Sequence, residues 1–349
     1  MDRPQHILLV RTDHLGDMLL TLPMVDVLRS CHPEARITVL ASAANALAAQ
    51  HHPEVDAVVV DAYEAKRSGL RGLWTLIGQI RVLHCDAALI VHPTPRLALA
   101  VWLAGIPIRV GTAYRAYSLL FNRRVRQHRR RPPQRHESEY NVELLVGLGC
   151  EVARIPIEPM RWQVDAAEAS SAASILRQLG VDDNERLVAI HPGSAGSAMN
   201  WSLEQYAELG KRFVAHGMVV AITGGPQETS LTASVVAAIG AGAVDLGGRL
   251  SLPQLAAVLK RCVLFVGSST GPTHMAAAVG TPVIALYSPL RSQAPVRWRP
   301  LGERVEVLQP NVDLVCAKCL GPACRYYHCM QLHLGVEWVE HAAQRQMQK

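Results

Sequence analysis

The stretch His6-Ile-Leu-Leu-Val-Arg11 runs directly into Thr12-Asp-His-Leu-Gly-Asp17, and these two segments decide the fold class. Four consecutive apolar residues bounded by polar ones are typical of a short strand that is buried on both faces. The polar, glycine-containing residues after them are typical of a loop that leads into a helix. The stretch therefore predicts a strand–loop–helix unit, from which parallel sheets are built.

The same alternation continues along the chain, with a less regular, arginine-rich stretch between residues 111 and 136. It is interrupted by the expected linker at residues 155–160, which carry two prolines. Before this interruption we expect strands over 6–11, 36–40, 57–61, 86–92 and 108–111, and helices over 15–31, 43–50, 70–83, 95–104 and 136–149. After it we expect strands over 186–191, 218–223, 243–246, 263–267 and 282–287, and helices over 166–179, 203–216, 227–239, 253–260, 272–279 and 336–348. The pattern predicts an α/β protein with two Rossmann-like, doubly wound parallel sheets.

A length of 349 residues agrees with roughly two domains. We expect an N-terminal Rossmann-like domain over 1–157 and a C-terminal one over 158–335, which includes a cysteine-rich segment at 316–329. Residues 336–349 are expected to form a C-terminal helix.

Composition limits the possible partners. The chain has 35 Lys and Arg against 29 Asp and Glu, a net charge of +6, while 49% of its residues are hydrophobic, which excludes general disorder. No apolar run approaches the roughly 20 residues of a spanning helix, and the run at Ile7–Val10 is too short for a secretory signal. We therefore expect a cytoplasmic protein with an anionic partner.

Two acids follow the first strand. Asp13 and Asp17 lie where a loop turns into a helix, so either could act as a general base on a bound hydroxyl group. The alternative is that they only cap the helix and complement its dipole.

Three loops of the second sheet predict a nucleotide site. In Phe265-Val-Gly-Ser-Ser-Thr-Gly-Pro-Thr-His-Met275 a strand meets a helix N-terminus, which can hold a phosphate, although a simple connecting turn is the alternative. His191-Pro-Gly-Ser194 begins a loop of small residues that allows close approach to a diphosphate. Glu228, after Thr223-Gly-Gly225, could accept hydrogen bonds from ribose hydroxyls.

The segment Gly267-Ser-Ser-Thr-Gly271 also matches the nucleophile elbow of hydrolases, with Ser269 as the nucleophile. No His-Gly-Gly-Gly segment for an oxyanion hole occurs in the chain. A hydrolase is therefore disfavoured.

At these motifs the sequence resembles glycosyltransferase family 9, the ADP-heptose:lipopolysaccharide heptosyltransferases. The resemblance lies in residues 11–23, 191–201 and 269–282, and it extends to 103–111 and 136–145. It implies a GT-B fold, with two Rossmann-like domains facing across a cleft, and an inverting transfer without metal or other catalytic cofactor.

The resemblance also implies roles for individual residues. Asp17 matches the proposed catalytic base, and Asp13 is a second acid of the same loop. The expected donor-binding residues are Gly193, Ser194, Thr223, Glu228, Leu250, Ser269, Thr270, Gly271 and His274, and the expected acceptor-binding residues are Thr12, His92, Arg96 and Arg115.

Two positions depart from the family pattern. Relatives usually carry Lys or Arg just before the tryptophan, where this chain has Met199-Asn200-Trp201, and many have Asp where it has Ser269. Losing the cation should weaken stabilisation of the leaving diphosphate. Either a nearby Arg compensates for it, or the donor sugar is not heptose.

Cys316, Cys319, Cys324 and Cys329 have the density of a structural zinc site, or less favourably an iron site, with disulfides or free thiols as the alternatives. Eight arginines lie close together in the acceptor half: Arg115, Arg123, Arg124, Arg126, Arg129, Arg130, Arg131 and Arg135. Either they form a solvated loop or they bind an anionic glycolipid at a membrane surface. Aromatic residues make up only 5% of the chain, which argues against nucleic acid.

The expected function is transfer of heptose from ADP-heptose to a lipopolysaccharide-core or related cell-envelope glycan. The expected location is the inner face of the cytoplasmic membrane, as a peripheral protein. A nucleotide-sugar-binding protein without transferase activity and a nucleotide-sugar epimerase are the alternatives.

Overall fold

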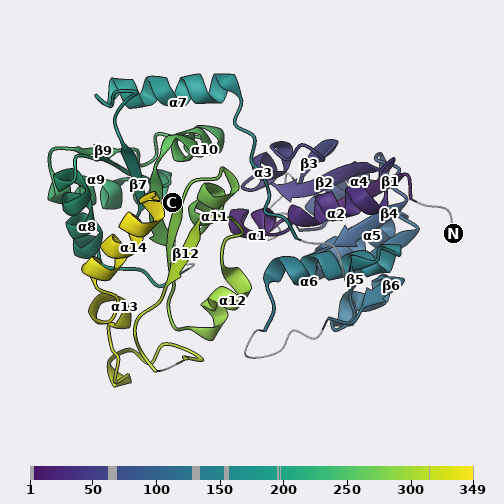
Figure 1. Ribbon diagram of the computed structural model, residues 1–349. Coiled ribbons are helices and arrows are strands. Elements are labelled where there is room, and N and C mark those ends of the chain that lie inside the picture. Colours follow the sequence, from purple (N-terminus) through teal and green to yellow (C-terminus); the bar gives the residue numbers. More distant parts are fainter. Residues whose placement is uncertain are drawn as a thin grey trace. The chain divides into compact units, whose positions relative to one another are not determined.

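The structure is a computed structural model that describes residues 4–61, 69–127, 134–152, 157–194, 196, 198–313 and 315–348. The chain divides between Met160 and Arg161 into two compact units, here called the N-terminal and the C-terminal unit. Each unit contains a six-stranded sheet (Figure 1) in which all neighbouring strands are parallel. The two doubly wound sheets predicted from the sequence are confirmed.

The sheet of the N-terminal unit has the order β3-β2-β1-β4-β5-β6. Its strands are β1 (His6–Val10), β2 (Arg36–Ser42), β3 (Ala57–Asp61), β4 (Ala87–Ile90), β5 (Ile108–Thr112) and β6 (Arg123–Val125). The strand order reverses between β1 and β4, so the loops after these two strands lie at the switch point where α/β proteins bind ligands.

The helices of this unit are α1 (Leu15–Leu19), α2 (Pro23–Cys31), α3 (Ala46–Gln50), α4 (Gly69–Arg81), α5 (Pro95–Leu103) and α6 (Glu137–Glu143), with 3-10 helices η1 (Ala116–Leu120) and η2 (Leu144–Leu148). The single helix expected over 15–31 is wrong, because the chain ends α1 at Leu19 and starts α2 at Pro23. Proline fits the first turn of a helix but not its interior.

The sheet of the C-terminal unit has the order β12-β11-β10-β7-β8-β9. Its strands are β7 (Leu187–His191), β8 (Val219–Ile222), β9 (Ala243–Asp245), β10 (Leu264–Ser268), β11 (Val283–Leu286) and β12 (Val305–Leu308). The strand order reverses between β10 and β7, so the loops after these two strands lie at the switch point of this sheet.

The helices of the C-terminal unit are α7 (Ala166–Gln178), α8 (Leu203–Ala215), α9 (Thr229–Ile239), α10 (Leu252–Arg261), α11 (Gly271–Ala278), α12 (Pro295–Trp298), α13 (Cys329–Leu332) and α14 (Val336–Gln348), with 3-10 helices η4 (Pro226–Glu228), η5 (Arg291–Gln293) and η6 (Gly321–Ala323). The C-terminal helix α14 packs Val339 and Ala343 into the same core as Val188 and Ile190 of β7. It is therefore part of this unit rather than a separate arm.

In the part of the chain that the structure describes, no helix is long and apolar enough to cross a membrane.

Candidate functional site

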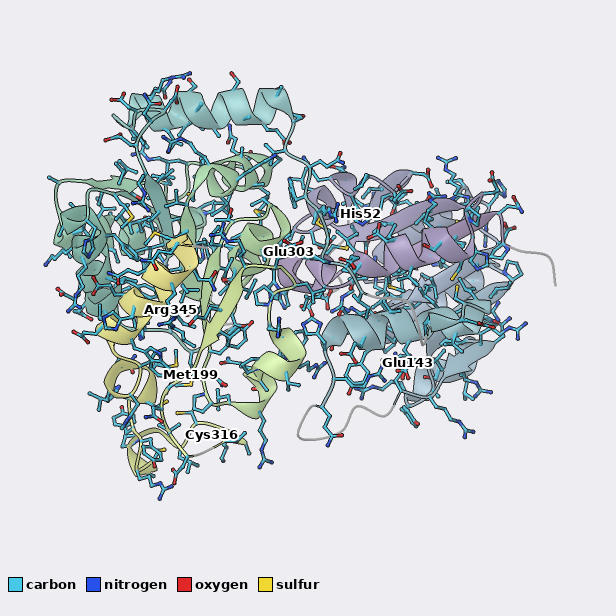
Figure 2. All side chains as sticks on the ribbon, in the orientation of Figure 1. His52, Glu143, Met199, Glu303, Cys316 and Arg345 are labelled. Atoms are coloured by element: carbon cyan, nitrogen blue, oxygen red, sulfur yellow. The ribbon has the colours of Figure 1, made fainter. Side chains whose placement is uncertain are left out.

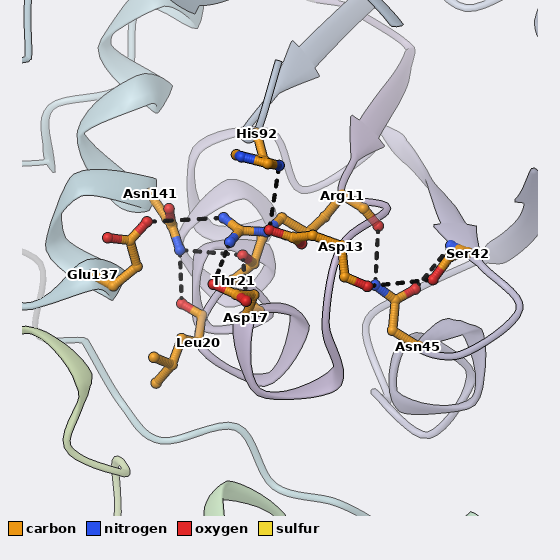
Figure 3. Close-up of polar contacts among 10 residues, drawn as sticks. All are labelled: Arg11, Asp13, Asp17, Leu20, Thr21, Ser42, Asn45, His92, Glu137 and Asn141. Atoms are coloured by element: carbon orange, nitrogen blue, oxygen red, sulfur yellow. Dashed lines mark hydrogen bonds and ion pairs between the residues drawn. The ribbon is translucent and has the colours of Figure 1, made fainter. Parts of the chain in front are cut away.

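The buried side chain of Arg11 organises the loop after β1 (Figure 3). Its guanidinium donates from Nε to Asp13 Oδ1 at 2.6 Å and from NH2 to Asp17 Oδ1 at 2.6 Å. A third acid, Glu137 at the start of α6, places Oε1 4.0 Å from NH1. Only 2% of the Arg11 side chain is exposed, against 16% and 17% of the two aspartates.

The surroundings of the loop raise the pKa values of both Asp17 and Arg11. Burial raises the pKa of Asp17, Arg11 opposes this shift, and the neighbouring carboxylates of Asp13 and Glu137 reinforce it. Burial works against the charged form of Arg11, but the carboxylates of Asp13 and Asp17 more than offset it and raise the pKa of Arg11. The loop thus holds a permanent cation beside a carboxylate whose proton affinity is above its usual range. Such a carboxylate can accept a proton from a substrate hydroxyl.

Neighbouring elements fix the backbone of this loop. The Asn45 amide donates to the carbonyl oxygen of Asp13 at 3.1 Å, and Ser42 N donates to Asn45 Oδ1 at 2.9 Å. At the end of α1, Thr21 Oγ1 donates to the carbonyl oxygen of Asp17 at 2.8 Å, and Asn141 of α6 donates to the carbonyl oxygen of Leu20 at 3.0 Å.

The expected acceptor residues differ in how they are placed. His92, after β4, has Nδ1 3.3 Å from Asp13 Oδ2 and a half-exposed side chain, and Thr12 is half-buried between Arg11 and Asp13. Arg96 instead forms a two-point ion pair with Asp61 of β3, which neutralises its charge. Arg115 is exposed at the start of η1. Of the arginine-rich stretch, Arg129, Arg130 and Arg131 lie outside the described residues.

Arg11, Glu137 and Asn141 are members of this site to which sequence reasoning assigned no role. Glu137 and Asn141 are far from Arg11 in the chain, and only the packing of α6 brings them to the loop. One available signal was that an arginine directly after a fully apolar strand must be buried, and a buried guanidinium requires acidic partners.

In the C-terminal unit, the loops after β7 and β8 meet at Glu228. Its carboxylate accepts a hydrogen bond from Gly225 N at 2.9 Å and lies 3.9 Å from His191 Nε2. His191 Nδ1 is 3.0 Å from Thr223 Oγ1, so the Thr223 side chain is buried against His191. A Cβ atom on Gly193 would lie 2.1 Å from Glu228 Oε1, so only glycine leaves room for this carboxylate.

The loop after β10 leads into α11. Its N-cap residue, Thr270, makes no side-chain capping bond, and Gly271 and Pro272 open the helix. Thr273 donates to the carbonyl oxygen of Ser268 and so ties the first turn back to the strand. His274 is buried one turn into the helix.

Asn200 is the centre of a further, half-buried network of hydrogen bonds. Its side chain donates to the carbonyl oxygen of Pro192 at 2.5 Å and accepts from the hydroxyls of Ser268 and Tyr206, the latter at 3.0 Å. Gln331 donates to the Asn200 carbonyl oxygen at 3.2 Å. Asn200 therefore fastens the loop after β7 to β10, and its amide is committed to that structural role.

Tyr287 connects the α11 loop to α12. Burial raises the pKa of Tyr287, while a hydrogen bond with Ser269 and the positive charge of Arg299 oppose the shift. The Tyr287 hydroxyl also donates to the carbonyl oxygen of Trp298 at 2.6 Å, which fixes the chain beside Arg299. The exposed Arg299 therefore follows directly on a residue that Tyr287 holds in place.

Two further expected donor residues, Ser194 and Leu250, are half-buried in the loops after β7 and β9. Ser194 Oγ donates to the carbonyl oxygen of Ala198 at 3.1 Å.

The arrangement also bears on the hydrolase alternative. The two ring nitrogens of His191, at the end of the strand beside β10, face Thr223 and Glu228. The Ser269 side chain bonds with Tyr287. Neither residue is placed as half of a serine–histidine pair.

The four clustered cysteines line one cavity of the C-terminal unit, which Met199 also lines. Figure 2 labels Met199 and Cys316. All four are free thiols, and burial, with the neighbouring Cys324 and Cys319, raises the pKa of Cys316. Within the described ranges, no three His, Cys, Asp or Glu side chains are grouped to hold a metal ion. The expected zinc or iron site at Cys316, Cys319, Cys324 and Cys329 is therefore not supported, because the thiols surround a cavity without converging on one point.

Comparison with known proteins places these sites in context. A model of glycosyltransferase family 9 (heptosyltransferase) matches residues 73–329. A putative glycosyltransferase of Haemophilus influenzae is 29% identical over 306 residues, which are 86% of this chain and 87% of the relative. Lipopolysaccharide heptosyltransferase 2 of Escherichia coli K12 is 26% identical over 319 residues, 87% of each protein.

The solved structure of E. coli ADP-heptose lipopolysaccharide heptosyltransferase II superposes with a TM-score of 0.82 at 22% identity and covers 98% of both chains. The GT-B fold class expected from the sequence is confirmed.

Proposed function

The chain belongs to glycosyltransferase family 9, and from this membership we propose that it transfers heptose from ADP-heptose to a lipopolysaccharide-core or related cell-envelope glycan. The transfer inverts the anomeric carbon and uses no metal ion. The protein works as a peripheral protein at the cytoplasmic face of the membrane. Lipopolysaccharide heptosyltransferases among its relatives support this choice of donor and acceptor.

The observation that carries the proposal is the position of Asp17. Its carboxylate lies in the first turn of α1, which follows the switch-point strand β1, is held by Arg11 at 2.6 Å, and has a raised pKa because it is buried. In the proposed reaction the oxygen of an acceptor hydroxyl bonds to the anomeric carbon of the donor sugar. Asp17 accepts the proton that this hydroxyl loses. The bond from that carbon to the diphosphate breaks, and ADP leaves with the bonding electron pair.

The leaving diphosphate is stabilised by the C-terminal unit. The uncapped N-terminus of α11 offers backbone N–H groups and the positive end of the helix dipole. We assign the compensating positive charge to Arg299, whose charge acts on Tyr287 beside the α11 loop. Asn200, which precedes the tryptophan, is committed to its hydrogen bonds with Pro192 and Ser268. Glu228 binds the ribose hydroxyls beside Gly193.

The test is a transfer assay with labelled ADP-heptose and a deacylated core acceptor, combined with calorimetric titration of ADP. For Asp17→Asn we expect kcat to fall by about 10²–10⁴-fold, because a general base contributes that much, while ADP affinity stays within about twofold. For Arg299→Gln we expect both kcat and ADP affinity to fall. Asp26→Asn, which removes an exposed acid of α2, is the matched control.

If the Asp17→Asn variant transferred heptose at the wild-type rate, the assignment of Asp17 as the general base would be wrong. ADP binding without transfer by the wild-type protein would favour the nucleotide-sugar-binding alternative, and epimerisation without acceptor would favour the epimerase. Parallel runs with UDP- and GDP-sugars identify the donor.

A further inference from the structure

Positive charge is concentrated in residues 69–126, all of which the structure describes. This segment contains 8 Arg, no Lys and one acid, Asp86, so its net charge is 8 − 1 = +7, more than the +6 of the whole chain. The eight are Arg71, Arg81, Arg96, Arg109, Arg115, Arg123, Arg124 and Arg126. Arg96 forms an ion pair with Asp61, which lies outside the segment.

The same segment exposes an unusual share of large apolar side chains. It contributes six of the thirteen such side chains that are exposed in the described part of the chain, although it is one sixth of the sequence. They are Leu70 (75% exposed), Trp74 (61%), Val82 (71%), Trp102 (46%), Tyr114 (51%) and Leu119 (80%). Exposed aromatic and aliphatic side chains at this density mark a docking surface.

Several of these side chains come from one helical layer. On the inner side, α4, α5 and Phe121 after η1 pack against the same face of the N-terminal sheet, through residues such as Leu76 and Val101. α4 contacts α5, and α5 contacts η1. On α4, Leu70 and Trp74 are one turn apart on the outer side, with Arg71 exposed beside them.

The register of the edge strand brings Arg124 to the same side. Arg124 of β6 pairs with Gly111 of β5, so their side-chain directions agree. A Cβ atom on Gly111 would meet the Phe121 ring at 2.5 Å, and Phe121 belongs to the core under α4 and α5. The exposed Arg124 therefore extends the outer surface of this layer. We call Leu70, Arg71, Trp74, Trp102, Leu119 and Arg124 the basic-apolar face.

We propose that the basic-apolar face docks the protein on an anionic lipid bilayer. Apolar and aromatic side chains enter the interfacial region of the bilayer, and arginines bind lipid phosphates at the same depth. A second copy of this chain is a poorer occupant, because like charges would oppose each other across the contact. The inference rests on the proposed function in one respect, because a lipid-linked acceptor requires the protein to reach a membrane.

The test is cosedimentation with vesicles that contain no glycan acceptor. At low salt we expect the wild-type protein to bind vesicles of phosphatidylglycerol and phosphatidylethanolamine, and not vesicles of phosphatidylcholine. Arg71→Gln with Arg124→Gln should lower the partition coefficient about 25-fold, since each cation at an anionic surface contributes about fivefold. Trp74→Ser with Leu119→Ser should weaken binding at low and at high salt.

Matched controls come from the C-terminal unit. Lys211→Gln with Lys260→Gln removes two exposed cations, and Trp338→Ser removes a tryptophan that is 40% exposed; both should bind like wild type. Circular dichroism checks that all variants fold, and transfer to a deacylated, soluble acceptor checks the active site separately. If the protein transfers heptose to the soluble acceptor but does not bind anionic vesicles, the docking proposal is overturned and the proposed transfer reaction still stands.

Two further results would overturn the docking proposal. One is that both double variants of the face bind vesicles as tightly as wild type. The other is wild-type self-association that Trp74→Ser with Leu119→Ser abolishes, without vesicle binding, which would make the face an interface between copies of the chain.

Discussion

Arg11 determines how the acids around it behave. A buried guanidinium remains charged, and it stabilises the ionised form of each carboxylate that bonds to it. Asp17 nevertheless has a raised pKa, because burial and the carboxylates of Asp13 and Glu137 outweigh the attraction of Arg11. Three acids around one cation therefore produce a base that holds a proton more strongly than an ordinary aspartate.

This balance predicts the pH dependence of the transfer reaction. A general base must be ionised, so kcat/KM should rise with pH through the pKa of Asp17, at a pH above the usual aspartate value of about 4. Asp13→Asn removes a like charge and should move this acidic limb to lower pH. The measurement is kcat/KM against pH for both proteins, with Asp26→Asn as a control that should not move the limb.

The acidic limb of the kcat/KM profile could instead stay in place or move to higher pH in Asp13→Asn. Either result would mean that the limb does not report the ionisation of Asp17, or that Asp13 does not affect the pKa of Asp17.

At the level of elements, the loops that follow strands β7, β8 and β10 form the expected donor site. They lie at the carboxyl edge of one parallel sheet, and contacts hold them together, such as Glu228 on His191 and Asn200 on Ser268. The close approach of Gly193 to Glu228 shows how little space separates two of these loops.

Gly193→Ala should therefore weaken donor binding. The added Cβ atom would lie 2.1 Å from Glu228 Oε1 and must displace this carboxylate. We expect the Kd for ADP and the KM for the donor to rise about tenfold, within the usual range for a local clash. Gly78→Ala in α4 is the matched control, because its Cβ atom would meet nothing within 4 Å. An unchanged Kd for Gly193→Ala would show that Glu228 is not a donor ligand.

At the scale of the whole molecule, two sheets with separate cores divide the proposed work. The acid is carried by the unit that ends at Met160, and the donor loops by the unit that begins at Arg161. A ligand stabilises the part of a protein that binds it, by about 2.7 kcal/mol at a hundredfold excess over Kd.

Saturating ADP should consequently slow hydrogen exchange in one unit. We expect protection in residues 191–194, 223–228 and 268–274 of the C-terminal unit, and little change in residues 11–17 of the N-terminal unit. Hydrogen exchange followed by mass spectrometry measures the protection of both units at once. UDP is the control for recognition of the adenine ring. Protection concentrated in residues 11–17 would contradict this division of roles.

The sequence by itself predicted the central strands, because each is a continuous apolar run that only a doubly covered parallel strand accommodates. It missed β6 (Arg123–Val125) and β12 (Val305–Leu308), which lie at sheet edges and carry charged residues. Edge strands are specified by the neighbour they pair with and much less by their own pattern.

The candidate site divides in the same way. Asp13, Asp17 and the residues of the α11 loop could be proposed from the sequence, because strand ends and helix starts are local signals. The roles of Glu137, Asn200 and Arg299 depend on contacts between segments distant in the chain, and the spacing of the cysteines predicted a metal site that the described residues do not form. Local spacing determines which residues reach the edge of a sheet, whereas packing decides which charges face each other there.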